Sequence, residues 1–376
     1  MEKFDVYPLY DIHPVKGLGA KLWDDQGKEY LDLYGGHAVI SVGHSHPYFV
    51  QQLKEQLDDL AFYSNSVQNE KQEELAKLLG RISKCEDYQL FMSSTGAEAI
   101  ENALKVASFQ TGRKKIIAMK NAFHGRTSGA VAVTDNPKII SPFNASHEVV
   151  FVPLNDPKAL TEAVDDETAA VIIEGVQGVA GIYEPSEEYL LHAQKCCKGK
   201  GALLILDEVQ SGVGRTGLFF AFQKANIQPD IITLAKGIGN GFPVGMTLLS
   251  SAITPWHGML GTTFGGNHLA CVAAISVLQI IEKEKLMQHA QAMGEFLKEA
   301  LKKIPSVQEV RGSGLMLGVQ MPFAVADLRK RMLLEHGIFL GSSAEPNTFR
   351  LLPPLNIKQT ELEYFLNQLQ LALKKV

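Results

Sequence analysis

Short apolar runs alternate with helical stretches between residues 90 and 250, and this alternation constrains the fold more than any other feature of the sequence. The runs occupy residues 90–92, 115–119, 169–174, 202–207, 230–236 and 245–250. Such alternation is typical of an α/β fold with a largely parallel sheet. The run ALLIL is apolar at every position, which is expected where helices cover both faces of the sheet. Ligands of such sheets bind beyond the carboxyl ends of the strands.

The C-terminal third predicts a second, smaller α/β unit. Residues 267–304 have the apolar spacing of two consecutive helices, and Thr360 followed by Glu363 has the spacing of a capping box that starts the last helix. Three further β-prone runs precede that helix, at residues 310–319, 337–340 and 348–352.

The N-terminal stretch 19–33 is typical of a hairpin that turns at Gln26 and Gly27, and we expect it to join the smaller unit. The prediction is therefore a large domain over residues 45–255 and a small domain formed by residues 1–44 and 256–376.

Composition excludes several classes of partner. The 36 Lys and Arg residues against 41 Asp and Glu residues give a net charge of −5, without a basic block, so we expect no nucleic-acid partner. No apolar stretch approaches the roughly 18 residues of a membrane-spanning helix. The N-terminus MEKFDVYPLY lacks the apolar segment of a secretory signal, which predicts a cytoplasmic protein. The four cysteines show no CxxC spacing, and we expect no metal site.

The segment STGAEAIENALKVA (94–107) is a candidate phosphate site. A β-prone run enters a turn of small residues and then a helix, with Thr95 and Glu98 at capping-box spacing. The start of a helix offers unpaired N–H groups and a positive dipole end, and Gly96 lets an anion approach the backbone closely. Taken by itself, this segment is better explained as an ordinary capped helix, because capping boxes are common.

Two further strands end in residues that carry chemistry. The run ALLIL ends at Asp207, where a buried carboxylate needs hydrogen bonds or a cation such as a protonated pyridine ring. The run IITLA leads into Lys236 and a glycine-rich turn, where desolvation can free the amine as a Schiff-base nucleophile. A salt-bridged aspartate and a solvated lysine are the structural alternatives. The conjunction of phosphate site, aspartate and lysine, each at a strand end, favours a cofactor site.

Motifs along the whole chain resemble those of class III, fold-type I pyridoxal-5′-phosphate aminotransferases, and most closely the acetylornithine aminotransferases. They are LWDDQGKEYLDL (22–33), GHSHP (43–47), SNSVQNEKQEELAKLL (64–79), STGAEA (94–99), NAFHGRT (121–127), DEVQSGVGRTG (207–217), AKGIGNGFPVG (235–245) and GTTFGGN (261–267). The resemblance implies the fold-type I architecture, a large domain with a mostly parallel sheet wrapped by helices and a smaller α/β domain.

The resemblance implies how pyridoxal phosphate is held and used. Lys236 would form the Schiff base and move a proton between substrate and cofactor, while Asp207 would keep the pyridine nitrogen protonated. Phe123 and Val209 would lie on the two faces of the ring, and Gln210 would reach its phenolic oxygen.

The phosphate would be bound by Gly96 and Ala97 through their N–H groups, with help from Thr95. In the family, the threonine that matches Thr263 reaches the phosphate of the partner subunit, which implies a homodimer. His124 is interpreted as structural.

Substrate recognition is implied by two arginines and a glutamate. Arg350 matches the arginine that holds the α-carboxylate of glutamate, and Arg126 matches the one that holds the distal carboxylate, because guanidinium pairs well with carboxylates. Glu174 matches the glutamate that pairs with Arg350 while an ω-amine is bound.

The resemblance thus predicts amino transfer between glutamate or 2-oxoglutarate and the ω-semialdehyde of an N-acylornithine such as N-acetylornithine, in arginine biosynthesis. N-Succinylornithine, ornithine or 4-aminobutyrate aminotransferase stays an alternative, as does an aminomutase or racemase on the same fold. A dinucleotide-binding module at residues 237–241 is a weak alternative, because the GxGxxG spacing is missing.

The chain departs from the family pattern in segments expected near the substrate. Gly175-Val176-Gln177-Gly178-Val179-Ala180-Gly181 stands where Pro-x-Gln-Gly-Glu-Gly-Gly is usual, so a charge and a ring constraint are gone. Gly35–Ser41 differs from the common Gly-Ile-Ala-Val-Asn, and His268 replaces a frequent proline. These departures leave the acyl group open.

Overall fold

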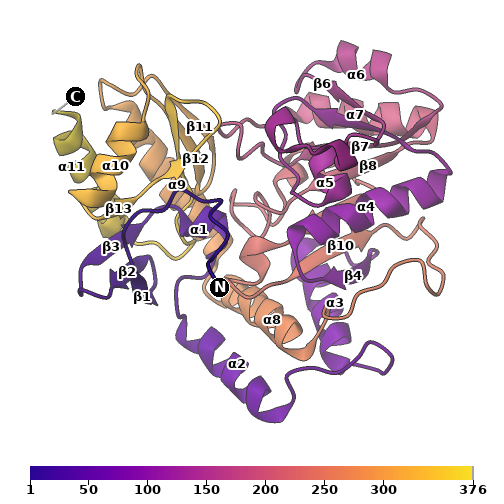
Figure 1. Cartoon of the computed structure of the whole chain (residues 1–376), viewed down its shortest axis with the longest axis horizontal. Coiled ribbons are helices and arrows are strands. Elements are labelled where there is room, and N and C mark those ends of the chain that lie inside the picture. The colour runs from indigo at the N-terminus through magenta and orange to yellow at the C-terminus, as the bar shows by residue number, and fades with distance from the viewer. Residues whose placement is uncertain (375–376) are drawn as a thin grey trace.

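The computed structural model describes residues 1–374 and shows a large unit and a smaller unit side by side (Figure 1). The large unit is built on a seven-stranded sheet. In spatial order its strands are β4 (Gln89–Ser93), β10 (Gly245–Leu249), β9 (Ile231–Leu234), β8 (Leu203–Asp207), β7 (Thr168–Glu174), β5 (Lys115–Met119) and β6 (Val149–Val152). Only β10 runs antiparallel to its neighbours, which confirms the largely parallel α/β sheet.

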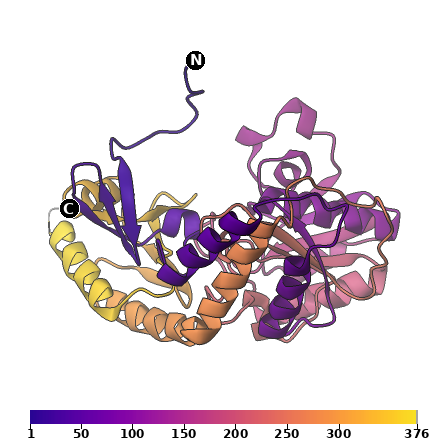
Figure 2. The same cartoon turned by 90° about the horizontal axis from the view of Figure 1, so that it is seen from below.

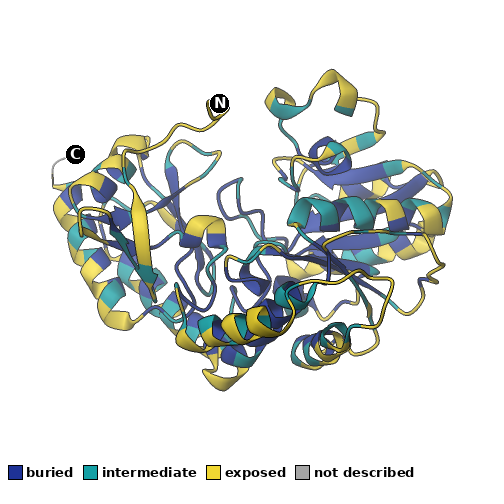
Figure 3. Ribbon diagram, turned by 60° about the horizontal axis from the view of Figure 1, so that its bottom comes forward, coloured by how far each residue is buried: buried dark blue, intermediate teal, exposed yellow. Residues whose placement is uncertain are grey.

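Both faces of this sheet are covered by helices, as its continuous apolar strands predicted. On β5, Ile116 and Ala118 pack with Ile100 of α4 on one face, whereas Ile117 and Met119 belong to the larger core on the other face. The helices of the large unit are α2 (Pro47–Asp59), α3 (Glu70–Ser83), α4 (Gly96–Thr111), α5 (Ser128–Ala132), α6 (Pro157–Ala163), α7 (Glu187–Lys200) and α8 (His268–Lys283). Figure 3 shows the buried strands and the exposed outer sides of the helices.

Four short 3-10 helices lie in the connections of the large unit. They are η1 (Pro137–Ile139), η2 (Pro142–Asn144), η3 (Ala221–Ala225) and η4 (Lys236–Ile238). Among residues 1–374, no helix has both the length and the apolar character needed to cross a membrane.

The smaller unit combines both ends of the chain, as Figure 2 shows. One sheet has the order β1 (Pro14–Leu18), β2 (Lys21–Asp24), β3 (Glu29–Asp32), β13 (Ile338–Phe339), and the other has the order β11 (Glu309–Ser313), β12 (Met316–Gln320), β15 (Thr348–Leu351), β14 (Gly341–Ser342). Because β3 pairs with β13, the N-terminal hairpin joins a C-terminal strand, as expected. The domain boundaries near residues 45 and 255 stay a prediction; α8, which follows the second boundary, is grouped with the large unit because it packs on α2 and α3.

The helices of the smaller unit are α1 (Gly35–Ala38), α9 (Leu286–Lys302), α10 (Ala326–Leu334) and α11 (Gln359–Leu373). The two predicted helices over residues 267–304 are α8 and α9. The segment α1 is a left-handed turn rather than a regular helix, because its φ values are positive from Gly35 to Ala38.

Two local predictions were wrong. Residues 310–319 are a hairpin, not one strand: the chain turns at Gly314, whose φ of 54° favours glycine. The last helix begins before Thr360, since the N–H of Lys358 donates to the carboxylate of Glu361 over 2.8 Å. Both segments contain more than one candidate turn or cap, and tertiary packing selects among them.

Candidate active site

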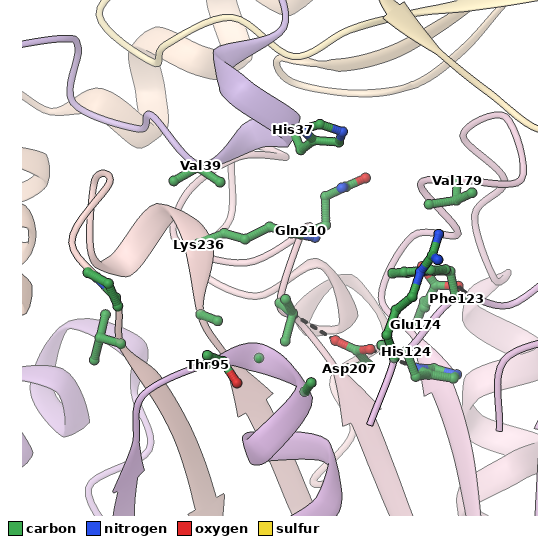
Figure 4. A pocket seen from close by; sticks show the side chains of 18 of the residues that line it. His37, Val39, Thr95, Phe123, His124, Glu174, Val179, Asp207, Gln210 and Lys236 are labelled. Carbon is green, nitrogen blue, oxygen red and sulfur yellow. Dashed lines mark hydrogen bonds and ion pairs between the residues drawn. The ribbon is translucent and has the colours of Figure 1, made fainter. Parts of the chain in front are cut away.

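A cavity of about 640 Å³ opens at the carboxyl ends of the large sheet, between the two units. It is lined by eleven of the twelve residues that the sequence analysis proposed for the site: Thr95, Gly96, Ala97, Phe123, Arg126, Glu174, Asp207, Val209, Gln210, Lys236 and Arg350. They come from separate strand ends and loops of the large unit and from β15 of the small unit. Figure 4 shows Thr95, Phe123, Asp207 and Lys236 around this space.

The N-terminus of α4 forms one side of the cavity. The Thr95 hydroxyl accepts a hydrogen bond from the N–H of Glu98 over 3.2 Å, and the Glu98 carboxylate accepts one from the N–H of Ser94 over 2.7 Å. At Gly96, a Cβ atom would lie 2.9 Å from the side chain of Val209, so only glycine fits without a shift. The capped helix start therefore presents free N–H groups to the cavity, as an anion site requires.

Asp207 lies at the end of β8 and is fixed by three donors. Its carboxylate accepts hydrogen bonds from the ring of His124 over 2.7 Å, from the N–H of Val209 over 2.9 Å and from the hydroxyl of Thr233 over 3.4 Å. Burial by itself would lower the pKa of His124, but the hydrogen bond and the charge of Asp207 outweigh it and raise that pKa. Nε2 of His124 is buried without a partner in the described chain.

Lys236 follows β9 and begins the turn η4 with a φ of 49°. Burial lowers the pKa of its amine, although the charges of Asp207 and Glu174 oppose this effect. An amine with a lowered pKa is neutral, and therefore nucleophilic, at a lower pH than a solvated lysine.

Arg350 is held by neutral groups. Its guanidinium donates to the carbonyl of Ser342, to Oε1 of Gln210 over 3.2 Å and to the hydroxyl of Tyr34 over 3.2 Å. The resemblance implies that Gln210 reaches the phenolic oxygen of the cofactor, and the structure shows that it also contacts Arg350. The pKa of Arg350 is lowered mainly by burial.

Glu174 is bound by two backbone N–H groups, and its pairing with Arg350 while an ω-amine is bound stays a prediction. Its carboxylate accepts hydrogen bonds from the N–H of Phe123 over 3.0 Å and of Gly178 over 3.3 Å, and within residues 1–374 no hydrogen bond or ion pair joins it to Arg350. Burial raises the pKa of Glu174 to about 7. The side chain of Arg126 is exposed, and among the described residues it has no hydrogen-bond or ion-pair partner.

Thr263 is the one proposed residue that the structure does not bring to the cavity. It is exposed in the connection between β10 and α8, where neighbouring Phe264 contacts the ring of Phe62 at 5.6 Å between centroids.

The class-III aminotransferase family model matches residues 5–373. The chain belongs to this family. It is 41% identical to the acetylornithine aminotransferase of Bacillus cereus over 369 residues, which cover 96% of this chain and 94% of that protein. It is 42% identical to the acetylornithine aminotransferase of Archaeoglobus fulgidus over 368 residues, which cover 96% of both chains.

Solved structures agree with the family assignment. The ornithine aminotransferase of Toxoplasma gondii superposes with a TM-score of 0.91 at 29% identity, covering 98% of this chain and 92% of that one. The acetylornithine aminotransferase of Elizabethkingia anophelis gives a TM-score of 0.84 at 28% identity, covering 98% and 95%. The class III aminotransferase and the fold-type I architecture predicted from the sequence are confirmed.

Sequence reasoning missed two kinds of residue. His124 contacts Asp207 directly, and its place beside Phe123 in the motif NAFHGRT was the available signal. Tyr34 also lines the cavity, from a turn that no local pattern predicts, whereas His37, Val39 and Val179 lie in the two segments that the sequence analysis expected near the substrate. The described residues contain no group of three or more His, Cys, Asp or Glu side chains that could hold a metal ion.

Proposed function

We propose that this protein transfers an amino group between glutamate or 2-oxoglutarate and the ω-semialdehyde of an N-acylornithine, with pyridoxal 5′-phosphate as cofactor, in arginine biosynthesis. The observation that carries the proposal is the convergence of Lys236, Asp207 and the N-terminus of α4 on one cavity, together with Arg126 and Arg350. The acetylornithine aminotransferases that are about two-fifths identical over nearly the whole chain support the choice of substrate.

The residues of the cavity fit the cofactor. The capped start of α4 suits a phosphate, Asp207 suits a protonated ring nitrogen, and the amine of Lys236 suits a carbonyl carbon. Gly96 and Ala97 would hold the phosphate with Thr95. When bound, the cofactor supplies an electron sink that stabilises negative charge at the substrate carbon.

The protein's own residues would divide the remaining work. Lys236 would attack as a neutral amine, and then carry the proton between the two carbon atoms that exchange it. Asp207, oriented by His124, would keep the ring nitrogen protonated. Phe123 and Val209 would pack on the ring and exclude water from its faces.

Arg350 and Arg126 would bind the two carboxylates of glutamate. Because the partners of Arg350 are neutral, its charge is available to a carboxylate of the substrate. Binding of an ω-amine with one carboxylate would leave Arg350 to Gln210, Tyr34 and the nearby charge of Glu174, which partly opposes the lowering of the pKa of Arg350 by burial.

A homodimer is part of the proposal. Thr263 is exposed and does not line its own chain's cavity, and a second copy would bring it to the phosphate. Sedimentation of the purified protein should give twice the 41.2 kDa chain mass. Thr263→Ala should weaken cofactor binding without changing the visible spectrum at saturation. A monomer with full activity would contradict this part.

The substrate is tested with a panel of amino donors against 2-oxoglutarate. The panel contains N-acetylornithine, N-succinylornithine, ornithine and 4-aminobutyrate, and glutamate formed per donor consumed is measured. We expect one glutamate per donor, with the highest kcat/KM for an N-acylornithine. Donor loss without glutamate would indicate a mutase or racemase, and preference for a free ω-amine would reject the acylornithine substrate. We expect the protein to act in the cytoplasm.

A further inference from the structure

Two segments form adjoining walls of the cavity, although nearly the whole sequence of the large unit lies between them. Residues 34–43 contribute Tyr34, His37 and Val39, and residues 236–245 contribute Lys236 and the turn that follows it. Figure 4 shows Val39 and His37 on the wall next to Lys236. The first segment also holds Arg350 through Tyr34, so it belongs to the substrate side of the site.

Asn240 ties these two walls together. Its Oδ1 accepts hydrogen bonds from the N–H groups of Ser41 over 2.9 Å and Val42 over 3.1 Å, and its Nδ2 donates to the carbonyl of Gly43 over 3.0 Å. The hydroxyl of Ser41 returns the contact by donating to the carbonyl of Gly237 over 2.5 Å. Asn240 is only 6% exposed, so these bonds are formed away from water.

The turn that Asn240 closes is conformationally demanding. Lys236 and Asn240 both have a positive φ, of 49° and 44°, a conformation that asparagine adopts more readily than most residues but that lysine rarely adopts. At Gly239 a Cβ atom would lie 2.2 Å from the carbonyl oxygen of Phe242, so the turn is also tightly packed. Such conformations persist only where surrounding contacts determine them, and the bonds of Asn240 are contacts of that kind.

We propose that Asn240 is a positioning residue, which holds the turn carrying Lys236 against the substrate wall through the backbone of Ser41, Val42 and Gly43. The inference rests on the proposed role of Lys236 as the reacting amine. Without the hydrogen bonds of Asn240, the amine of Lys236 and the substrate wall could move apart. A displacement of about 1 Å at a reacting group can lower the rate about a hundredfold.

A matched control separates positioning from general loosening. Nδ2 of Asn356 donates to the carbonyl of Val42 over 2.9 Å, so it holds the same segment from the small unit. Among the hydrogen bonds of the described chain, Asn356 makes none to the Lys236 turn. Asn356→Ala therefore removes support from the substrate wall without cutting the link to Lys236.

The experiment compares Asn240→Ala, Ser41→Ala and Asn356→Ala as cofactor-loaded proteins. The rate and apparent affinity of the glutamate half-reaction are measured, with the thermal midpoint and the pH midpoint at which the visible band of the cofactor joined to Lys236 changes. We expect Asn240→Ala to slow the half-reaction by about 10- to 100-fold and to shift the pH midpoint, with the apparent affinity for glutamate within about threefold. Ser41→Ala should show the same changes to a smaller extent, and Asn356→Ala should keep the rate within about threefold.

The inference is overturned if Asn240→Ala reacts at the wild-type rate, or if it loses no more rate than Asn356→Ala at an equal fall in thermal midpoint. Should Asn240→Ala fail to fold, Ser41→Ala, which cuts only the bond to the carbonyl of Gly237, decides by the same criteria. Wild-type protein that forms no band or ignores glutamate would contradict the proposed function instead.

Discussion

The floor and the mouth of the cavity are built in different ways. The floor consists of the strand-end residues Thr95, Asp207 and Lys236, which come from the central sheet and are fixed by caps, buried hydrogen bonds and tight turns. The mouth includes His37 and Arg126, which are exposed on loops; the segment of His37 departs from the family pattern, whereas that of Arg126 matches it. This comparison indicates that residues at the strand ends determine the reaction, whereas residues on the loops at the mouth determine which substrate binds.

The largest effect is expected at the floor. Lys236→Ala should abolish both half-reactions, with a loss of at least about 10⁴-fold, because it removes the nucleophile and the proton carrier together. The measurement is turnover of glutamate and the ω-semialdehyde, each followed separately, with cofactor added in excess. Full turnover by this variant would contradict the claim that the residues of the floor carry out the reaction.

Arg350→Ala tests whether this arginine, which lies between the floor and the mouth, binds the α-carboxylate of glutamate. Loss of a paired, buried guanidinium should lower kcat/KM for glutamate by about a hundredfold, because the α-carboxylate loses its partner. Arg350→Lys keeps the charge but not the planar fork, and should recover only part of the loss. If Arg350→Ala spares the glutamate half-reaction and cripples the ω-amine half-reaction, the roles of Arg350 and Arg126 are reversed.

His124→Asn should slow both half-reactions by about tenfold and to the same extent. The ring nitrogen of the cofactor serves both directions, and the asparagine variant leaves Asp207 without the ring of His124 that orients it. His44→Asn is the control, because His44 contacts Asp32 over 2.8 Å in a similar pair that does not line the cavity. Equal losses in the two variants would show that His124 acts through stability alone.

Glu208→Gln should have the smallest effect on turnover and a clear effect on stability. Burial raises the pKa of Glu208 to about 7 from 4.5, so the folded state favours the protonated carboxyl. That contribution to stability is complete below pH 4.5 and is lost as the pH rises through 7, with a total of about 3 kcal/mol.

The free energy of unfolding of both proteins, measured from pH 4 to pH 8.5, checks this prediction. Relative to the wild type, the glutamine variant should gain about 3 kcal/mol across that range. A constant difference between the two proteins would show that the Glu208 carboxyl ionises normally in its bonds to Ser211 and Phe222.

The same contrast explains what the sequence could predict. The strands β8 and β9 were predictable because they are almost wholly apolar, and β8 ends in Asp207 while β9 leads directly into the turn that begins with Lys236. The partners of Glu174 and Arg350 were not, since they depend on how loops from distant parts of the chain meet. The hairpin at Gly314 was missed because a β-prone run with three glycines fits one bulged strand as well as two strands.

The central claim is tested most directly by the visible absorption spectrum of the purified protein with pyridoxal phosphate, before and after L-glutamate and then N-acetylornithine semialdehyde. We predict a visible band from the cofactor joined to Lys236, which disappears with glutamate and returns with the semialdehyde. No band at all would contradict the cofactor site. A band that ignores glutamate would contradict the amino transfer and leave only the cofactor.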